Sequence, residues 1–264
     1  DKLRKILFGK YDINLGEGLL FGTSYRINKP YFLSYKPTSI TKESLSSKEY
    51  NYFKGVAAQW KIRNTDVDLF LSHRKLNGKT SIDKTGLFRT HEEVEKRKTI
   101  KENLLGLTIS KEKKGTKISW AGILYRSDYL NDKNNFFQSL YLSKNYYNID
   151  YSGEVALQNI DKWKLIQKLT ISVSNKSLIT LQFRNRNDSI FNEYRSDYSS
   201  FSNGYENGFL WCFQHYFNKK WQFRTTFDYF KSNFLKNEKD DFTSGRKIYS
   251  EISRSTDKRK FILQ

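Results

Sequence analysis

Three arginines and one aspartate have the residue types and the spacing needed to contact an anion. Arg184 and Arg186 lie two positions apart, and Arg224 and Asp228 lie four positions apart. In an extended strand, residues separated by an even number of positions point to the same face. A face rich in arginine can bind or pass anions, whereas arginines that pair with carboxylates would instead hold an interior rigid. The spacing alone leaves both interpretations open.

A second candidate set lies in one loop and consists of Gly86, Arg89, Thr90 and Glu93. A threonine followed three positions later by a glutamate is typical of a capping box, which begins a helix. We expect a short charged helix from His91 to Arg97 or Lys98. An Arg89–carboxylate contact would anchor this loop to the wall of the sheet.

Catalytic and metal-binding patterns are not found. The three histidines, His73, His91 and His215, lie on separate segments without metal-ligand spacing. His73 follows Ser72, but it shares its parity with neighbouring aliphatic residues and not with Asp66 or Asp68, so a triad on this strand cannot converge. Cys212 is the single cysteine, which excludes an internal disulfide, and we expect it to be an ordinary strand residue. We therefore expect neither an enzyme nor a cofactor.

The elements that carry these residues have a two-residue hydropathy period. On one parity between 221 and 229 lie Trp221, Phe223, Phe227 and Tyr229; on the other lie Gln222, Arg224, Thr226 and Asp228. A β-strand places these two sets on opposite faces. The same alternation recurs along most of the chain, with aromatic residues on the apolar side. A membrane-spanning β-barrel, with lipid outside and a wet lumen inside, requires this combination.

The connections between the predicted strands are of two kinds. Tight turns are expected near Asn64, Lys114, Asn175 and Lys219, and long polar loops surround Pro30, Thr85 and Ser196. Outer-membrane barrels have short periplasmic turns and long external loops. Many of the expected strands exceed ten residues, whereas strands of soluble proteins average about five or six. A soluble β-sandwich, which also alternates, is the competing interpretation.

Composition is consistent with a sheet that buries one face. The chain has 264 residues, with 37% hydrophobic and 16% aromatic residues. It contains no apolar run of about 18 residues, the length of a transmembrane helix. The formal net charge of +19 favours anionic partners such as nucleic acid, lipopolysaccharide phosphates or acidic solutes. AT-rich coding, which raises the lysine content, is an alternative source of this charge.

Several segments resemble the barrel region of the helix-hairpin-helix-containing outer-membrane proteins of Bacteroidota-type bacteria. Leu15–Leu19 is similar to that family's Phe-Gly-Gln-Gly-Leu, with Glu17 in place of Gln. Ser47–Glu49 and Phe53–Ala57 are similar to its Ser-x-x-Glu and Arg-Gly-x-Ala stretch, with Lys54 in place of Arg. Further matches are Gly86–Glu93, which is similar to Gly-x-His-Arg-Thr-x-x-Glu with Phe88 where His is common, then Leu181–Arg186 and Lys220–Phe230.

The motifs occur in the same order and extend over nearly the whole chain. The resemblance implies a Gram-negative outer-membrane barrel. The DNA-binding module that gives the family its name precedes the barrel, and this sequence contains no paired helices with a Gly-containing hairpin. The resemblance therefore implies a fold and a compartment more firmly than an activity.

Together these observations predict one all-β domain over 1–264. We expect an antiparallel transmembrane β-barrel of about twelve or more strands, or a segment of a larger barrel incomplete at one or both ends, with long loops and one short loop helix. The expected location is a bacterial outer membrane. The expected function is a porin-like channel or uptake conduit with a basic lumen, with DNA or another polyanion among its candidate substrates. The alternative is a non-conducting assembly or scaffold barrel whose loops bind a partner protein. Expected partners are outer-membrane lipid, lipopolysaccharide, a polyanion, and other outer-membrane or periplasmic proteins.

Overall fold

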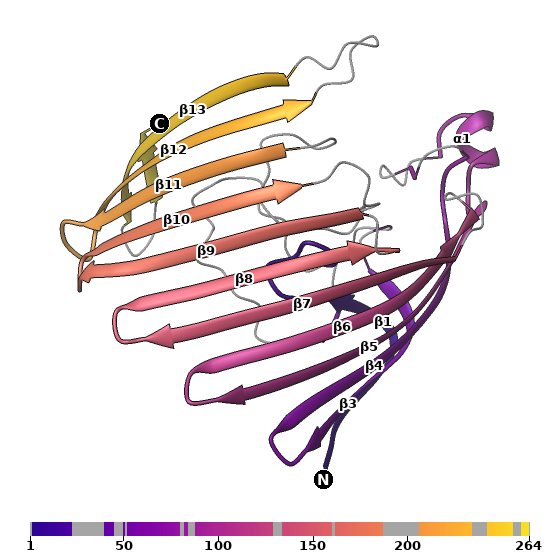
Figure 1. Ribbon diagram of the computed structural model, residues 1–264. Coiled ribbons are helices and arrows are strands. Elements are labelled where there is room, and N and C mark those ends of the chain that lie inside the picture. The colour runs from indigo at the N-terminus through magenta and orange to yellow at the C-terminus, as the bar shows by residue number, and fades with distance from the viewer. Residues whose placement is uncertain are drawn as a thin grey trace.

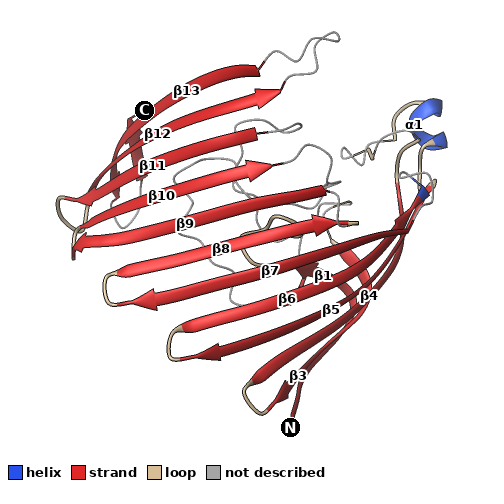
Figure 2. Cartoon of the chain, viewed as in Figure 1, coloured by secondary structure: helices blue, strands red, loops and turns tan. Residues whose placement is uncertain are grey.

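The chain forms a single antiparallel sheet with one short helix. The computed structural model describes residues 2–22, 40–44, 50, 52–79, 82–83, 88–128, 134–159, 162–186, 206–233, 242–255 and 260–263. Its strands are β1 (Lys2–Ile13), β2 (Thr41–Glu43), β3 (Phe53–Ile62), β4 (Thr65–Leu76), β5 (Ile100–Lys113), β6 (Thr116–Ser127), β7 (Asn134–Tyr146), β8 (Ile149–Gln158), β9 (Lys162–Ser174), β10 (Ser177–Arg186), β11 (Glu206–Tyr216), β12 (Trp221–Asn233), β13 (Phe242–Ser255) and β14 (Lys260–Leu263). The helix α1 spans His91–Glu95, between β4 and β5 (Figures 1 and 2).

The strands follow one another as a meander. From β3 to β14 each strand pairs with its neighbours in sequence, and β1 lies between β3 and the short β2. The sheet is strongly curved (Figure 1). Over the described residues it is an open sheet, with β2 at one edge and β14 at the other. The expectation of an all-β antiparallel fold is confirmed, whereas closure into a barrel stays a prediction.

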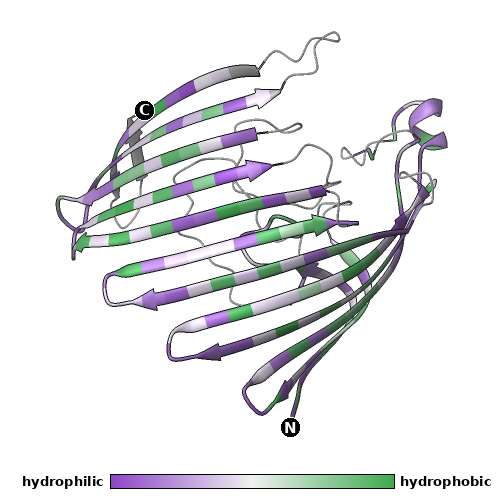
Figure 3. Cartoon of the chain, viewed as in Figure 1, coloured by the Kyte–Doolittle hydropathy of each residue, from purple (hydrophilic) through white to green (hydrophobic). Residues whose placement is uncertain are grey.

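Alternate residues along the strands have opposite exposure. In β4, Asp68, Phe70 and Ser72 are buried, whereas Leu69 and Leu71 are exposed. We call the face that carries the buried set the inner face and the opposite one the outer face. The alternation of hydropathy is visible along the strands in Figure 3. The exposed set includes many aliphatic and aromatic side chains, so much of the outer face is apolar even though it is not covered by another layer of the described chain.

The short turns lie together at one end of the strands (Figure 1). Two-residue connections join β3 to β4, β5 to β6, β7 to β8 and β9 to β10, and four residues join β11 to β12. The turn residues Arg63, Lys114 and Tyr147 have positive φ values, the conformation typical of such hairpins. The tight turns expected near Asn64, Lys114, Asn175 and Lys219 are confirmed, and the loop centres Pro30, Thr85 and Ser196 lie outside the described residues.

The inner face carries an apolar cluster near the start of the chain. Tyr11 and Ile13 of β1 pack there with Phe53 and Phe70, and Tyr125 and Phe137 extend the cluster across β6 and β7. The residues after β1 do not continue as a strand. Leu15–Phe21 form a tight turn on the inner face, where Leu19, Leu20 and Phe21 are buried. The sheet therefore curves around its own N-terminal segment.

Candidate functional site

Arg184 lies at the centre of a buried charge cluster on the inner face. Its side chain is 1% exposed and forms ion pairs with Glu206 of β11 and Asp228 of β12. The guanidinium Nε donates to the Glu206 carboxylate, and a terminal nitrogen donates to Asp228 Oδ1 at 2.8 Å. One cation thus contacts two carboxylates from two neighbouring strands. Charge-assisted hydrogen bonds of this kind are stronger than neutral ones.

The sheet register explains how three strands meet at this guanidinium. Arg184 lies opposite Gly208, and the next inner position of β11, Leu210, lies opposite Asp228. A Cβ atom at Gly208 would lie 2.4 Å from the Arg184 guanidinium carbon. The missing side chain at Gly208 therefore makes room for the guanidinium on the inner face.

The structure brings together only three of the four residues in the first candidate set, which are Arg184, Arg186, Arg224 and Asp228. Arg186 is 2% exposed and lies opposite Glu206, so it belongs to the same cluster as Arg184 and Asp228. Arg224 lies on the same face but four residues along β12 from Asp228, where its Nε is 3.4 Å from the side-chain oxygen of Gln214. The shared parity is confirmed, and the register separates Arg224 from the other three residues.

Buried charges on the described chain do not show an excess of basic residues. The buried bases are Arg74, Lys164, Lys168, Arg184 and Arg186, and the buried acids are Asp12, Asp68, Glu102, Glu154, Glu206, Asp228 and Glu251. A second buried pair, Arg74 and Glu102 at 2.6 Å, repeats the arrangement around Arg184. The positive charge of the whole chain therefore lies outside this buried set, and three of the buried bases, Arg74, Lys168 and Arg184, each pair with an acid on the inner face.

A second set of polar contacts joins the N-terminal turn to β8 and β9, in the middle of the sheet. Glu154 of β8 accepts hydrogen bonds at one oxygen from the backbone N–H groups of Glu17, at 2.7 Å, and Leu19, at 3.2 Å. Its other oxygen accepts from the Ser139 hydroxyl at 2.6 Å. Gly16 has a φ of +49°, and a Cβ atom there would lie 2.7 Å from the Glu154 carboxylate. Only glycine allows this turn to approach Glu154 so closely.

The Glu17 side chain adds an ion pair to the same contact. Its carboxylate lies 2.6 Å from Lys168 Nζ of β9, and both side chains are almost fully buried. The turn is therefore held to β8 by backbone hydrogen bonds and to β9 by charge, across about 150 residues of sequence separation. We call this contact the turn latch, comprising Gly16, Glu17, Glu154 and Lys168.

The loop unit contains the expected capping box. Thr90 is the N-cap of α1, its hydroxyl accepts from the Glu93 N–H, and the Glu93 carboxylate accepts from the backbone N–H of Thr90. Backbone donation from Arg89 at 2.5 Å and from Thr90 at 3.1 Å holds the pKa of the Glu93 carboxyl below its ordinary value. The helix ends at Glu95, shorter than expected, and a turn over residues 96–98 follows.

The anchoring of this loop differs from the expectation. The Arg89 guanidinium lies 3.9 Å from Glu93 of the helix that follows it, not at a strand. The contacts to the end of β4 come instead from the backbone: Gly78 N–H donates to Lys96 O, and Lys98 N–H donates to the Asn77 side chain, each at 2.8 Å. Gly86 lies outside the described residues.

The histidines lie apart from the buried acids. His73 is on the outer face, with its Nδ1 2.6 Å from Asn103 Oδ1, whereas Ser72 points inward and accepts from the Lys54 N–H at 3.0 Å. His215 contacts Ser177 at 2.9 Å. Within the described ranges, no group of three or more His, Cys, Asp or Glu residues could hold a metal ion. No described helix is long and apolar enough to cross a membrane.

Sequence reasoning missed Glu206, Glu154 and the docking of Glu17. The polar composition around Ser196 predicts a loop, but β11 begins at Glu206, whose parity with Gly208 and Leu210 places it on the inner face. Gly16 and Gly18 both have positive φ values in the N-terminal turn, but nothing in the sequence identifies the partner of this turn on β8.

Comparison of the chain with models of known protein families finds no match, and comparison with curated proteins finds no relative.

Proposed function

We propose that this chain forms the wall of a bacterial outer-membrane β-barrel, with its outer face toward lipid and its inner face toward the lumen. The observation that carries the proposal is the inverted distribution of polarity. Arg184, Glu206 and Asp228 are buried, whereas Leu140, Val173 and Ile248 are 54%, 59% and 76% exposed. A water-soluble sheet with this arrangement would expose its apolar side chains and bury its charges, the reverse of the usual preference.

Strand length supports the proposal. Apart from β2 and β14, the described strands contain 10 to 14 residues. A tilted strand needs about 9–11 residues to cross the hydrocarbon core. The same strands are about twice as long as typical soluble ones, at about five or six residues.

Exposed aromatic residues lie near both ends of the strands. Three of them lie at or beside the short turns: Tyr147, Phe217 and Trp221. Trp163, at the beginning of β9, lies near the other end of the strands. Aromatic side chains form girdles at both membrane interfaces of outer-membrane barrels. The positions of these rings support a lipid-facing apolar band that lies between the two ends of the strands.

We infer that the barrel acts as an occluded scaffold, whose external loops bind a partner protein, more than as an open pore. The reason is the paired inner face: Arg184 is neutralised by two carboxylates, and the turn latch holds a folded segment inside. This proposal gives the barrel no catalytic role. Lipopolysaccharide is the lipid that we propose surrounds the end of the barrel with the long loops.

Anion conduction is the second candidate, favoured by the net charge of +19. DNA or another polyanion is the solute class that this charge would attract. Planar-bilayer recording separates the two functions. The scaffold should give no stable conductance steps and should co-purify with an outer-membrane or periplasmic partner, whereas a conduit should give anion-selective steps.

Refolding tests the membrane assignment itself. The chain should fold with detergent or lipid and should migrate differently on a gel before and after boiling, as a stable β-barrel does. A monodisperse, folded chain in plain buffer would contradict the assignment.

A further inference from the structure

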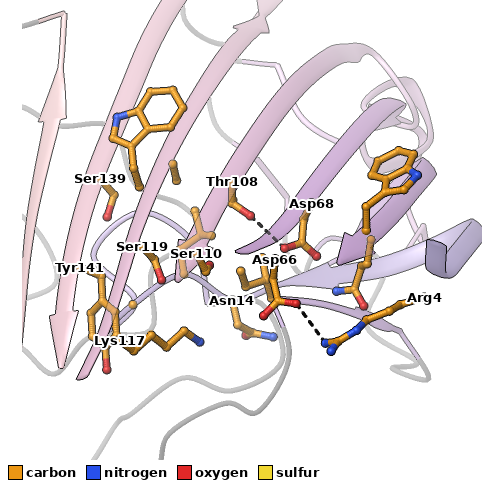
Figure 4. A pocket seen from close by; sticks show the side chains of 17 residues that line it. Arg4, Asn14, Asp66, Asp68, Thr108, Ser110, Lys117, Ser119, Ser139 and Tyr141 are labelled. Carbon is orange, nitrogen blue, oxygen red and sulfur yellow. Dashed lines mark hydrogen bonds and ion pairs between the residues drawn. The ribbon is translucent and has the colours of Figure 1, made fainter. Parts of the chain in front are cut away.

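A polar cavity opens on the inner face, with most of its polar side chains on the neighbouring strands β4 to β7; it lies apart from the Arg184 cluster, and Gly16 of the turn latch forms part of its lining. It has a volume of about 180 Å³. Figure 4 shows Asp66 and Asp68 of β4, Thr108 and Ser110 of β5, and Ser119 of β6 around it. A cavity of about 150 Å³ is already large enough to hold benzene. The space is therefore large enough for a small organic molecule.

The lining groups are arranged in a row by the sheet register. Asp66 lies opposite Ser110, Ser110 opposite Ser119, and Ser119 opposite Tyr141. Neighbouring strands are about 4.8 Å apart, so oxygen-bearing side chains repeat at that spacing along the row. Such a row can contact several polar groups of one flat molecule at once.

Buried polar atoms in the cavity have unused hydrogen-bonding capacity. Asp68 is 3% exposed, and its Oδ2 accepts from the Thr108 hydroxyl at 3.0 Å. The Gln59 side chain lies close to the same carboxylate, but among the described residues no hydrogen bond of ordinary geometry reaches Oδ1. The hydroxyl of Ser110, also 3% exposed, and that of Ser119 likewise have none within this part of the chain. Buried polar atoms are normally satisfied by a partner. A carboxylate oxygen and two hydroxyls therefore point to a ligand that both donates and accepts.

The charges around the cavity select an uncharged ligand. Two acids, Asp66 and Asp68, are balanced by two bases, Arg4 and Lys117, in the same lining. Arg4 already pairs with Asp66 at 3.1 Å (Figure 4). A net anion would face Asp68, and a net cation would face Lys117. An apolar ligand would leave the serines and Asp68 without partners, which is costly.

We propose that this cavity binds a small, uncharged polyhydroxylated molecule of monosaccharide size. Each hydroxyl of such a ligand both donates and accepts, so it can donate to Asp68 Oδ1 and exchange hydrogen bonds with Ser110 and Ser119. The Tyr141 ring closes one end of the row. The site does not depend on membrane insertion, because Asp68, Ser110 and Ser119 lie on the inner face of the sheet.

Titration calorimetry on the full chain tests the site, with the protein refolded in a detergent whose head group carries no sugar. Glucose, galactose and mannose are the probes, used up to about 0.1 M, which is a hundredfold above a 1 mM dissociation constant. At least one hexose should bind saturably. Ser110→Ala should weaken that binding roughly tenfold, the effect of one lost hydrogen bond to a buried group. Asp68→Asn should weaken it at least as much.

Ser152→Ala is the matched control. Ser152 is a buried inner-face serine whose hydroxyl also has no partner among the described residues, but it does not line the cavity. Its substitution should leave binding unchanged. Ser119→Ala, at a half-buried position, provides a second cavity variant in case Asp68→Asn does not fold. The proposal is overturned if no hexose binds saturably, if calcium or glycine binds at the cavity in place of a hexose, or if Ser152→Ala weakens binding as much as Ser110→Ala.

Discussion

At the scale of single residues, Arg184 is the buried base that pairs with two buried acids. Its guanidinium contacts Glu206 and Asp228, and all three side chains are no more than 2% exposed. Removal of one member from a buried ion pair leaves an uncompensated charge, which is far more costly than replacement of all members. We therefore expect the cluster to select the pairing register of β10, β11 and β12 more than to raise the free energy of unfolding above that of an uncharged cluster.

Arg184→Met should destabilise the folded chain by about 3–5 kcal/mol, because two buried carboxylates lose their cation. The double variant Arg184→Met, Asp228→Asn should recover part of that loss, because Glu206 still lies opposite Arg186. Urea unfolding in lipid vesicles, followed by tryptophan fluorescence, measures both. Arg224→Met is the control, since Arg224 is only partly buried and should cost much less. An equal loss of unfolding free energy in Arg184→Met and Arg224→Met would show that the ion pairs of Arg184 do not stabilise the fold.

Gly16 tests the turn latch at the same scale. Gly16→Ala places a methyl group 2.7 Å from the Glu154 carboxylate and a side chain at a φ of +49°. Gly115→Ala is the matched control in an exposed hairpin, where φ is +73° and the added atom meets only Asn145 O at 3.2 Å and its Cβ at 3.9 Å. The control should lose only the left-handed cost of about 1–2 kcal/mol. Gly16→Ala should lose clearly more in the same unfolding experiment, and equal losses would argue against docking of the turn.

At the scale of elements, the beginning of α1 is stabilised by the carboxylate of Glu93. The pKa of Glu93 lies below its ordinary value of 4.5, because the Arg89 and Thr90 N–H groups donate to the ionised form. The capping contribution is therefore complete above pH 4.5 and is lost as the pH falls through the lower folded value. Carbon-13 NMR of the Glu93 carboxyl should report this depressed midpoint. Glu93→Gln should remove the pH dependence of α1, and a midpoint at or above 4.5 would contradict the capping box as the cause.

The strands show how far the sequence could predict the fold. In β12, strict alternation between Trp221 and Tyr229 predicts both the strand and its two faces, because no irregularity interrupts the period. In β1 the pairing with β3 shifts between Leu3 and Lys5. Leu3, Ile6 and Phe8 are all exposed, although they differ in parity. A bulge of this kind breaks the two-residue period, so the strand could be recognised only near its end.

The candidate sites were predictable to the extent that they are local. The capping box of Thr90 and Glu93 lies within four residues, and the sequence identifies it directly. The partners of Arg184 lie 22 and 44 residues away, and the partner of the Glu17 N–H lies 137 residues away. Such contacts depend on the register of several strands and on the path of the N-terminal segment, which parity alone does not determine.

At the scale of the whole molecule, the outer face should respond to charge as a lipid-facing surface does. Leu140→Arg, in the middle of β7, should cost about 2–4 kcal/mol in vesicles, because an arginine at the bilayer midplane is unfavourable. Val173→Arg, beside the β9–β10 turn, should cost only about 0–1 kcal/mol near the interface. Both residues are similarly exposed, at 54% and 59%. On a water-exposed surface the two substitutions would have equally small effects.

The most direct test is to locate the outer face relative to lipid. A single cysteine at Leu140, or at Ser143 on the inner face of the same strand, can be labelled with a fluorophore in a Cys212→Ala background and reconstituted in vesicles. We expect lipids with a nitroxide on the acyl chain to quench the Leu140 label strongly and the Ser143 label weakly, with aqueous iodide having little access to Leu140. Strong iodide quenching at Leu140, with no effect of the nitroxide lipids, would contradict a lipid-facing outer surface.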